Sequence, residues 1–302
     1  MKKPLVCARD KYIDGDRITH FCMDMLLLII AVLVLYPIYY VLIASISHPS
    51  AISTGEVLIL PKGLNLDAYK KLLENKSIWI GYRNSILYTS AAVLVDLFIQ
   101  ITTAFALSRE KMPARKVVMT MFVITMYFSG GMIPKYLLLN SLGLINTPLA
   151  MILPNCISAY NIIVAKNFFE NNIPDSLYDA SCIDGCGYIG YFVRIVIPLS
   201  KAIIAIIALY SMQTHWNAYL TAQMYIYKSS LYTLQQVISS ITATLDTSLV
   251  ESMSTGEYAA IMQTKQLIKY AVVVVSSIPL VIIYPFVQKF FVRGIMLGAV
   301  KG

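Results

Sequence analysis

The sequence predicts an all-α, polytopic membrane protein with six transmembrane helices, and three observations support this. Hydrophobic residues make up 58% of the 302 residues and charged residues 13%, whereas soluble domains carry about 25% charged residues. The mean hydropathy is +0.68. Six apolar stretches can each cross a hydrocarbon core of about 30 Å, and in lipid each should be helical because its backbone groups must pair within the segment.

The expected spans, in chain order, are residues 21–46, 85–107, 117–137, 147–168, 193–222 and 267–291. The fifth span is long and should bend near Pro198, because proline removes a helix hydrogen bond. The sixth span carries Pro279 and Pro285.

The segments between and beyond the spans complete the predicted organisation. They are an N-terminal segment (1–20), a transmembrane domain (21–291) with a polar loop at 170–192 and two long outer segments (47–84 and 224–266), and a C-terminal tail (292–302). The outer segments are predicted to contain a short helix at 66–73 and an amphipathic pattern at 234–241. They can be connecting loops, or a cap on the outer face that meets another protein.

Lysine and arginine residues set the expected orientation. If the N-terminus is cytoplasmic, the inner segments carry 15 of the 24 basic residues, and the short loop 108–116 alone carries four. Short cytoplasmic loops are enriched in these residues. The pattern places both termini and the loop 170–192 in the cytoplasm. The net charge of +8 is therefore read as an orientation signal, and no basic run typical of nucleic-acid binding occurs.

No enzyme motif is found in the sequence. It contains no Gly-x-x-x-x-Gly-Lys-Ser/Thr loop for nucleotide phosphates, no Gly-x-Ser-x-Gly elbow and no His-Glu-x-x-His zinc helix. The three histidines are scattered, and the five cysteines form no Cys-x-x-Cys and no evident disulfide framework. The sequence therefore predicts no catalytic site and no metal site.

The polar loop between the fourth and fifth spans carries the strongest functional signal. Pro174 and Asp175 are helix-start residues, and Gly185 is a typical left-handed stop. They predict a helix of about ten residues, roughly 15 Å long, whose small side chains allow close approach to a partner protein's groove. An ordinary polar loop is the alternative. The candidate docking residues are Asp179, Ala180, Ser181, Cys182, Asp184 and Gly185, supported by Ile195 and Pro198.

The spacing of these residues resembles the EAA loop of ABC importer permeases, which reads roughly Glu-Ala-Ala-x-x-x-Gly, nine residues, Ile-x-x-Pro. Asp179, Ala180, Ser181 and Gly185 stand at the first positions, and Ile195 and Pro198 at the last. Asp179 replaces the usual Glu, Ser181 replaces an Ala, and Ala202 stands where many relatives have a second Pro. The resemblance extends to Trp216-Asn217, to 231–235 and to 284–302, and it is strongest to the maltose-type carbohydrate permeases.

This resemblance implies a function and a set of partners. The chain is expected to be the second of two paired permeases in a cytoplasmic-membrane importer of an oligosaccharide or a polysaccharide fragment. The implied partners are a second, homologous permease, two ATPase subunits and an extracytoplasmic solute-binding protein. ATP and Mg²⁺ would be bound by the ATPase subunits, and this chain would carry no cofactor. The ATPase pair would grip the loop helix and rock the membrane helices between inward-open and outward-open states.

Asp96 is a carboxylate near the middle of the second span, where a charge costs several kcal/mol. Together with Thr89, Gln100 and Thr103 it forms a polar stripe at helical spacing. Three interpretations remain open: a neutral or hydrogen-bonded contact between helices, part of a substrate path, or a proton relay.

A second polar stripe lies on the fifth span. It consists of Gln213, Trp216, Asn217 and Thr221. Aromatic faces and amides are the groups that bind sugars, although packing between helices and an interfacial tryptophan would give the same pattern. The possible substrate path therefore comprises Gln213, Trp216, Asn217, Thr221, Asp96 and Gln100. The neighbouring His215 is interpreted as a hydrogen-bonding group and not as a metal ligand.

Two other functions are weighed against an importer permease. An ion-coupled secondary transporter would use Asp96 as a proton or sodium site and would need no ATPase. A membrane enzyme acting on lipid or glycan would need a clustered set of acids or metal ligands, which the sequence lacks.

Overall fold

The computed structural model describes residues 10–247 and 267–285, and it describes the side chains of residues 19–241, 243 and 267–285. These residues form helices, turns and loops, and no strand occurs among them. The chain divides into two compact units, one made of the described parts of 1–72 and 249–275 and the other of 73–248 and 276–302. Each unit is described by itself.

The first unit contains a long helix and a folded segment that follows it. Its helices are α1 (Asp10–Ser45), α2 (Pro49–Ser53) and most of α3 (Asp67–Glu74). The helix α3 confirms the helix predicted at 66–73. By contrast, α1 begins at Asp10, so the predicted N-terminal segment 1–20 is partly helical, and the helix continues through Asp14-Gly15, a dipeptide that usually favours a turn.

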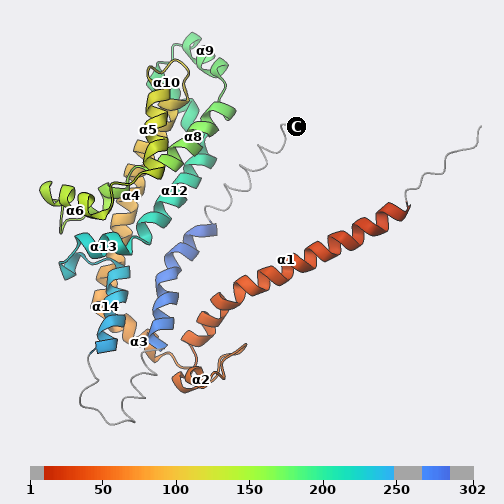
Figure 1. Ribbon diagram of the computed structural model, residues 1–302, viewed down its shortest axis with the longest axis vertical. Coiled ribbons are helices and arrows are strands. Elements are labelled where there is room, and N and C mark those ends of the chain that lie inside the picture. Colours follow the sequence, from red (N-terminus) through yellow and green to blue (C-terminus); the bar gives the residue numbers. More distant parts are fainter. Residues whose placement is uncertain (1–9, 248–266, 286–302) are drawn as a thin grey trace, which may run out of the picture. The chain divides into compact units, whose positions relative to one another are not determined.

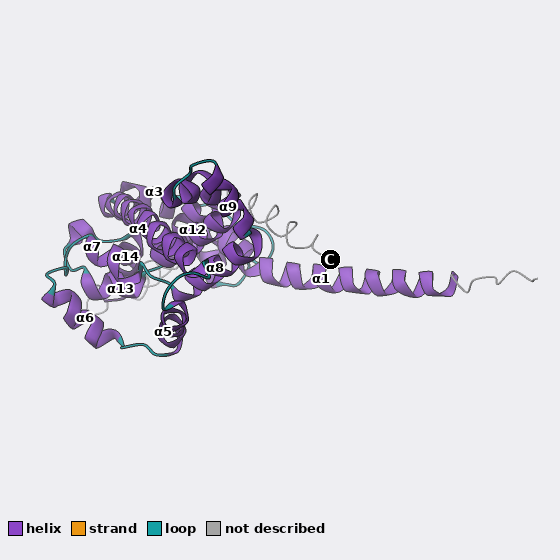
Figure 2. Cartoon of the chain, turned by 90° about the horizontal axis from the view of Figure 1, so that it is seen from above, coloured by secondary structure: helices purple, strands orange, loops and turns teal. Residues whose placement is uncertain are grey.

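The second unit is a helical bundle built along α4 (Lys76–Ser108). Its further helices are α5 (Arg115–Tyr127), α6 (Met132–Ser141), α7 (Leu149–Ile152), α8 (Ala159–Asn172), α9 (Asp175–Ile183), α10 (Tyr188–Tyr191), α11 (Ile197–Leu199), α12 (Lys201–Trp216), α13 (Tyr219–Tyr225) and α14 (Leu234–Thr247). The helices α8, α12 and α14 pack against α4, and α9 and α14 lie at opposite ends of this bundle (Figure 1). Figure 2 looks along the bundle and shows α5 and α6 at its margin.

The helices account for six membrane spans when each bent pair is counted as one. Thr19–Ser45, Lys76–Ser108 and Leu267–Pro285 are long and apolar enough to cross a bilayer. The three bent pairs are Arg115–Tyr127 with Met132–Ser141, Leu149–Asn155 with Ala159–Asn172, and Tyr188–Leu199 with Lys201–Trp216. The predicted fold class is thus confirmed. The last residues of the sixth predicted span, 286–291, and the tail 292–302 lie outside the described residues.

The bent pairs correct the prediction of continuous spans. The third span breaks at Phe128–Gly131 with a bend of 114°, where Gly131 has φ +84°, a conformation that favours glycine. The fourth bends by 55° after Asn155, near Pro154. A break at these points is expected because proline and glycine interrupt helix hydrogen bonding.

The fifth span bends near Pro198 as predicted, but it ends earlier than predicted. Residues Phe192–Val196 form a π-helix, and the chain turns by 81° between Leu199 and Lys201. Pro198 lacks the N–H that a continuous helix would use, which explains the irregularity. The helix α12 then ends at Trp216 and not at 222, because the chain turns at Asn217 before α13 begins.

The segment leading into α14 is attached to the first turns of α4. The Ser85 hydroxyl accepts a hydrogen bond from the Leu234 N–H (2.8 Å), and the Asn84 amide donates to the carbonyls of Ser230 (2.9 Å) and Tyr232 (3.0 Å). The start of α14 is capped reciprocally by Thr233 and Gln236. The predicted amphipathic pattern at 234–241 is therefore a helix that packs on α4.

Gly81 of α4 lies against the start of α14, and this gives a first prediction. A Cβ added to Gly81 would lie 3.0 Å from the Leu234 Cα atom, so Gly81→Val should separate the two helices. We expect a loss of roughly 1–3 kcal/mol in stability, as for other overpacked sites, seen as a lower melting temperature and faster proteolysis within α14. The control is Gly130→Val, because nothing lies within 4 Å of a Cβ at Gly130. Equal stability of the two variants would contradict this packing.

Candidate functional site

The helix α9 is a short, sharply terminated helix at one end of the bundle. Pro174 precedes it and Asp175 is its first residue. At its other end the Cys186 N–H bonds the Ser181 carbonyl (2.9 Å) and the Gly185 N–H bonds the Cys182 carbonyl (3.0 Å), the pattern of a Schellman cap. Gly185 has φ +73°, and a Cβ added to it would have no atom within 4 Å. The glycine is therefore needed for its backbone conformation and not for close packing.

The two faces of α9 differ in exposure. The candidate residues Asp179, Ala180, Cys182, Asp184 and Gly185 are exposed, and the neighbouring Ile183 is 87% exposed. These residues form an outward surface on which a partner protein can dock.

Ser181 departs from the predicted docking set. It is buried, and its hydroxyl donates to the Tyr178 carbonyl (2.7 Å). Its small side chain therefore allows α9 to lie close to the bundle instead of contacting a partner. Of the two support positions, Ile195 is half-buried against the core and Pro198 is exposed.

The inward face of α9 rests on a cluster of aromatic rings. Tyr178 of α9 contacts Tyr188 (5.6 Å between ring centroids) and Tyr191 (5.2 Å). Phe105, in the last turn of α4, contacts Tyr188 (5.5 Å), Tyr191 (6.2 Å) and Phe192 (4.7 Å). A hydrogen bond with the Cys182 thiol raises the pKa of the Tyr178 hydroxyl. The rings thus join α9, α4 and α10.

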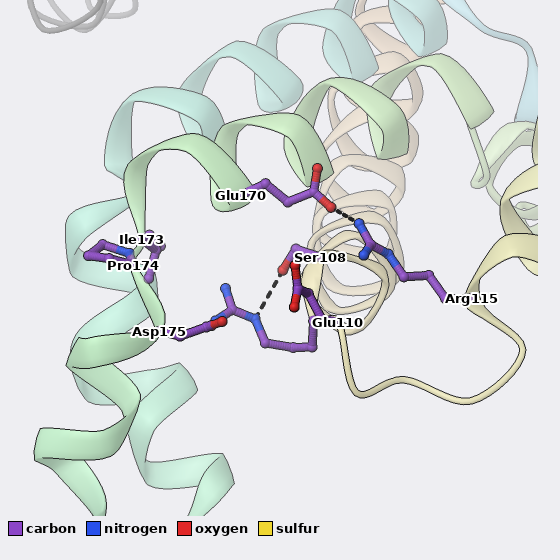
Figure 3. A pocket seen from close by; sticks show the side chains of 8 residues that line it. Ser108, Glu110, Arg115, Glu170, Ile173, Pro174 and Asp175 are labelled. Carbon is purple, nitrogen blue, oxygen red and sulfur yellow. Dashed lines mark hydrogen bonds and ion pairs between the residues drawn. The ribbon is translucent and has the colours of Figure 1, made fainter. Parts of the chain in front are cut away.

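Two arginines beside α9 form ion pairs: Arg109 of the α4–α5 loop and Arg115, the first residue of α5. Arg109 donates to the Asp175 carboxylate (3.0 Å) and to the Ser108 hydroxyl (3.1 Å), and its guanidinium lies over the Phe105 ring (4.9 Å to the centroid). Arg115 pairs with Glu170 of α8. Figure 3 shows Asp175, Ser108, Arg115 and Glu170 around a groove of about 300 Å³. The sequence had marked these arginines only as orientation signals.

Asp96 pairs with His215 between α4 and α12. The Asp96 Oδ2 and His215 Nε2 atoms are 3.2 Å apart, and both side chains are 2% exposed. Gln100 donates to the Cys156 carbonyl (3.0 Å) and is fully buried. Asp96 and Gln100 are therefore contacts between helices in this chain and do not line an open surface. The pairing with His215 agrees with the helix-contact interpretation of Asp96.

The Asp96–His215 pair is part of a two-layer polar cluster. Gln100 lies one turn from Asp96 on α4, and Ser211 lies one turn from His215 on α12. The two helices run in opposite directions (Figure 1), so Gln100 and Ser211 lie on the same side of the pair. One polar atom each of Asp96, His215, Gln100 and Ser211 is buried without a partner among the described residues. Residues of this kind usually bind internal water.

The stripe predicted on the fifth span separates into two parts. Trp216 is buried and donates to the Ser276 carbonyl (3.3 Å), and it borders an apolar groove together with Met212 and Pro279. Gln213 and Asn217 are exposed, while Thr221 is half-buried in α13.

Gln213 and Asn217 belong to an exposed stripe that also includes Tyr210 and Thr214. Tyr210 contacts the exposed Tyr160 of α8, with ring centroids 6.4 Å apart. A polar surface at membrane depth has to face protein or water. Tyr160, Tyr210 and Thr214 were not predicted from the sequence, although 210, 213, 214 and 217 follow helical spacing.

The six-span architecture and the exposed α9 fit a permease of a binding-protein-dependent importer. The family described as "Binding-protein-dependent transport system inner membrane component" matches residues 77–297, and the chain belongs to this family. It is a multi-pass protein of the inner (cytoplasmic) membrane and a transporter component. Membership of this family favours the importer permease over the ion-coupled secondary transporter and the membrane enzyme.

Relatives with known names extend over nearly the whole chain. The Polygalacturonan/rhamnogalacturonan transport system permease protein YtcP of Bacillus subtilis is 37% identical, with 91% of this chain and 96% of the relative covered. Protein LplC of the same organism is 35% identical, over 95% and 96%. The crystal structure of a bacterial ABC transporter that imports the acidic polysaccharide alginate has a chain with a TM-score of 0.81 and 31% identity, over 96% of this chain and all of that one.

Proposed function

We propose that this chain is a permease subunit of an ABC importer for acidic oligosaccharides rich in uronic acids. Two of its most similar relatives carry names of acidic polymers, polygalacturonan and alginate. The exposed, glycine-terminated helix α9 is the observation that supports the coupling mechanism, because a permease that lacks a nucleotide-binding motif needs a surface through which an ATPase can act. The proposal also covers the class of substrate, the partner subunits and the side of the membrane on which α9 lies.

The proposed assembly contains this chain, a second and different permease, two ATPase subunits and a solute-binding protein. One ATPase subunit receives the exposed face of α9 in a groove. ATP and Mg²⁺ bind to the ATPase subunits, whose closure moves α9 and rocks the bundle. This arrangement places α9 and both chain termini in the cytoplasm, and places α14 where the binding protein docks.

The exposed stripe on α12 is the proposed surface along which the sugar passes. Tyr160 and Tyr210 offer aromatic faces to the C–H surfaces of a sugar ring, and Gln213 and Asn217 offer amides to its hydroxyls. The second permease completes the path.

Transport by the purified complex tests this function. The chain is co-expressed with a second permease, the ATPase subunits and a solute-binding protein of the same organism, and the complex is reconstituted into proteoliposomes with ATP inside. We expect uptake of trigalacturonate that requires ATP and the binding protein. Uptake of maltotriose in its place would overturn the substrate class. Uptake that needs an ion gradient and no ATPase would overturn the function.

A further inference from the structure

We infer that Arg109 is a positioning residue that ties α9 to α4, so that movement of α9 is transmitted to the long helix at the centre of the bundle. This inference rests on the proposed coupling role of α9. It assigns a role to a residue outside the loop 170–192 and identifies α4 as the helix that receives the motion.

The first observation is the connectivity of α9. Along the chain, α9 is joined to α8 before it and to α10 after it. The helix α4 is not its neighbour in sequence, yet α4 contacts α8, α12 and α14. A motion of α9 that reaches α4 directly therefore moves three further helices. Arg109 directly follows the last residue of α4 and bonds Asp175, the first residue of α9.

The second observation is how firmly the Arg109 side chain is placed. Its side chain is only 12% exposed, although it belongs to a polar loop. The Ser108 hydroxyl and the Phe105 ring fix the guanidinium from the α4 side. A fixed planar guanidinium loses little freedom when it bonds a carboxylate, and a lysine cannot replace this geometry.

The third observation concerns the carboxylate. The Asp175 side chain is 73% exposed, so it contributes little to the packed core. An exposed ion pair adds at most about 1 kcal/mol to stability. The pair is thus better suited to holding the direction of α9 relative to α4 than to stabilising the fold, and removing the Asp175 charge should leave the protein folded.

The chain supplies a matched control at the start of α5. Arg115 also forms an ion pair, but with Glu170 of α8, and neither residue belongs to α9. Figure 3 shows both Asp175 and the Arg115–Glu170 pair in the same groove. Neutralising Arg115 changes the same net charge without cutting the link between α9 and α4.

The test measures sugar imported per ATP hydrolysed in proteoliposomes of the whole importer. We expect Arg109→Gln and Asp175→Asn each to lower this ratio about fivefold, equivalent to about 1 kcal/mol, and the double variant to be no worse than either single one. Arg109→Lys should fall between Arg109→Gln and the unaltered protein. Arg115→Gln should keep the unaltered ratio, and melting temperatures should show that all variants are folded.

The contrary results distinguish a failure of this inference from a failure of the proposed function. If Arg109→Gln and Arg115→Gln give the same ratio, or if Asp175→Asn keeps full coupling, Arg109 does not transmit the motion of α9. If the unaltered complex shows no ATP-dependent uptake, the proposed function itself fails. Additive losses in the double variant would also overturn the inference. If the two residues act as one pair, removing the second partner should cause no further loss of coupling.

Discussion

Gly185→Pro should abolish productive ATPase docking while the protein still inserts into the membrane. The left-handed φ of +73° at Gly185 is inaccessible to proline, whose φ is fixed near −65°. Proline also removes the N–H that bonds the Cys182 carbonyl. The cap would open, and the exposed face of α9 would lose its shape. We expect at least about a tenfold loss in ATPase affinity, or about 1.4 kcal/mol, measured by co-purification and by titration of the purified ATPase.

Two variants separate the backbone effect from simple crowding. Gly185→Asn should be mild, because asparagine adopts the left-handed conformation more readily than most residues. Gly187→Val should also be mild, because Gly187 has φ −70° and open space around a Cβ. Normal ATPase binding and uptake in Gly185→Pro would show that the end of α9 has no part in docking.

Asp96→Ala should destabilise the bundle strongly, whereas Asp96→Asn should be mild. Alanine leaves the buried His215 Nε2 without its partner 3.2 Å away. We expect a loss of about 1–3 kcal/mol, the usual cost of a buried polar group left unpaired, measured as a lower melting temperature in detergent. Asparagine keeps a hydrogen-bonding group in the same place, so stability and uptake should stay near those of the unaltered protein.

A double-mutant cycle with His215→Ala shows whether the two residues act together. If they do, the double variant loses clearly less stability than the sum of the two single losses. An Asp96→Asn protein with normal stability and no uptake would contradict the expectation that this variant is mild. That result would show that the charge of Asp96 works in transport and that its contact between helices is secondary.

Helix content and the end of α9 could be predicted because they depend on local chemistry. Apolar length defined the spans, and Pro174 and Gly185 correctly bounded α9. The bend angles could not be predicted in the same way. Gly131 and Pro154 mark where helices break, but the direction in which the chain continues depends on packing against other helices.

The candidate site shows the same limit. Periodicity placed Trp216 and Gln213 on neighbouring positions of one polar stripe, yet Trp216 is buried and Gln213 is exposed. Likewise, Asp96 and His215 are separated by 119 positions along the chain, so sequence spacing could not predict their pairing. A sequence shows which residues share a face of one helix, but not which face meets which neighbour.

The most direct test of the account is a photo-crosslink from α9 in the assembled importer. A photoreactive amino acid replaces Ile183, which is 87% exposed, and the importer is irradiated in membranes. The same probe at Tyr219, at the start of α13, is the control. If α9 docks in a groove of the ATPase, position 183 captures the ATPase subunit and position 219 does not. Capture of the solute-binding protein from position 183, or of no protein at all, would contradict it.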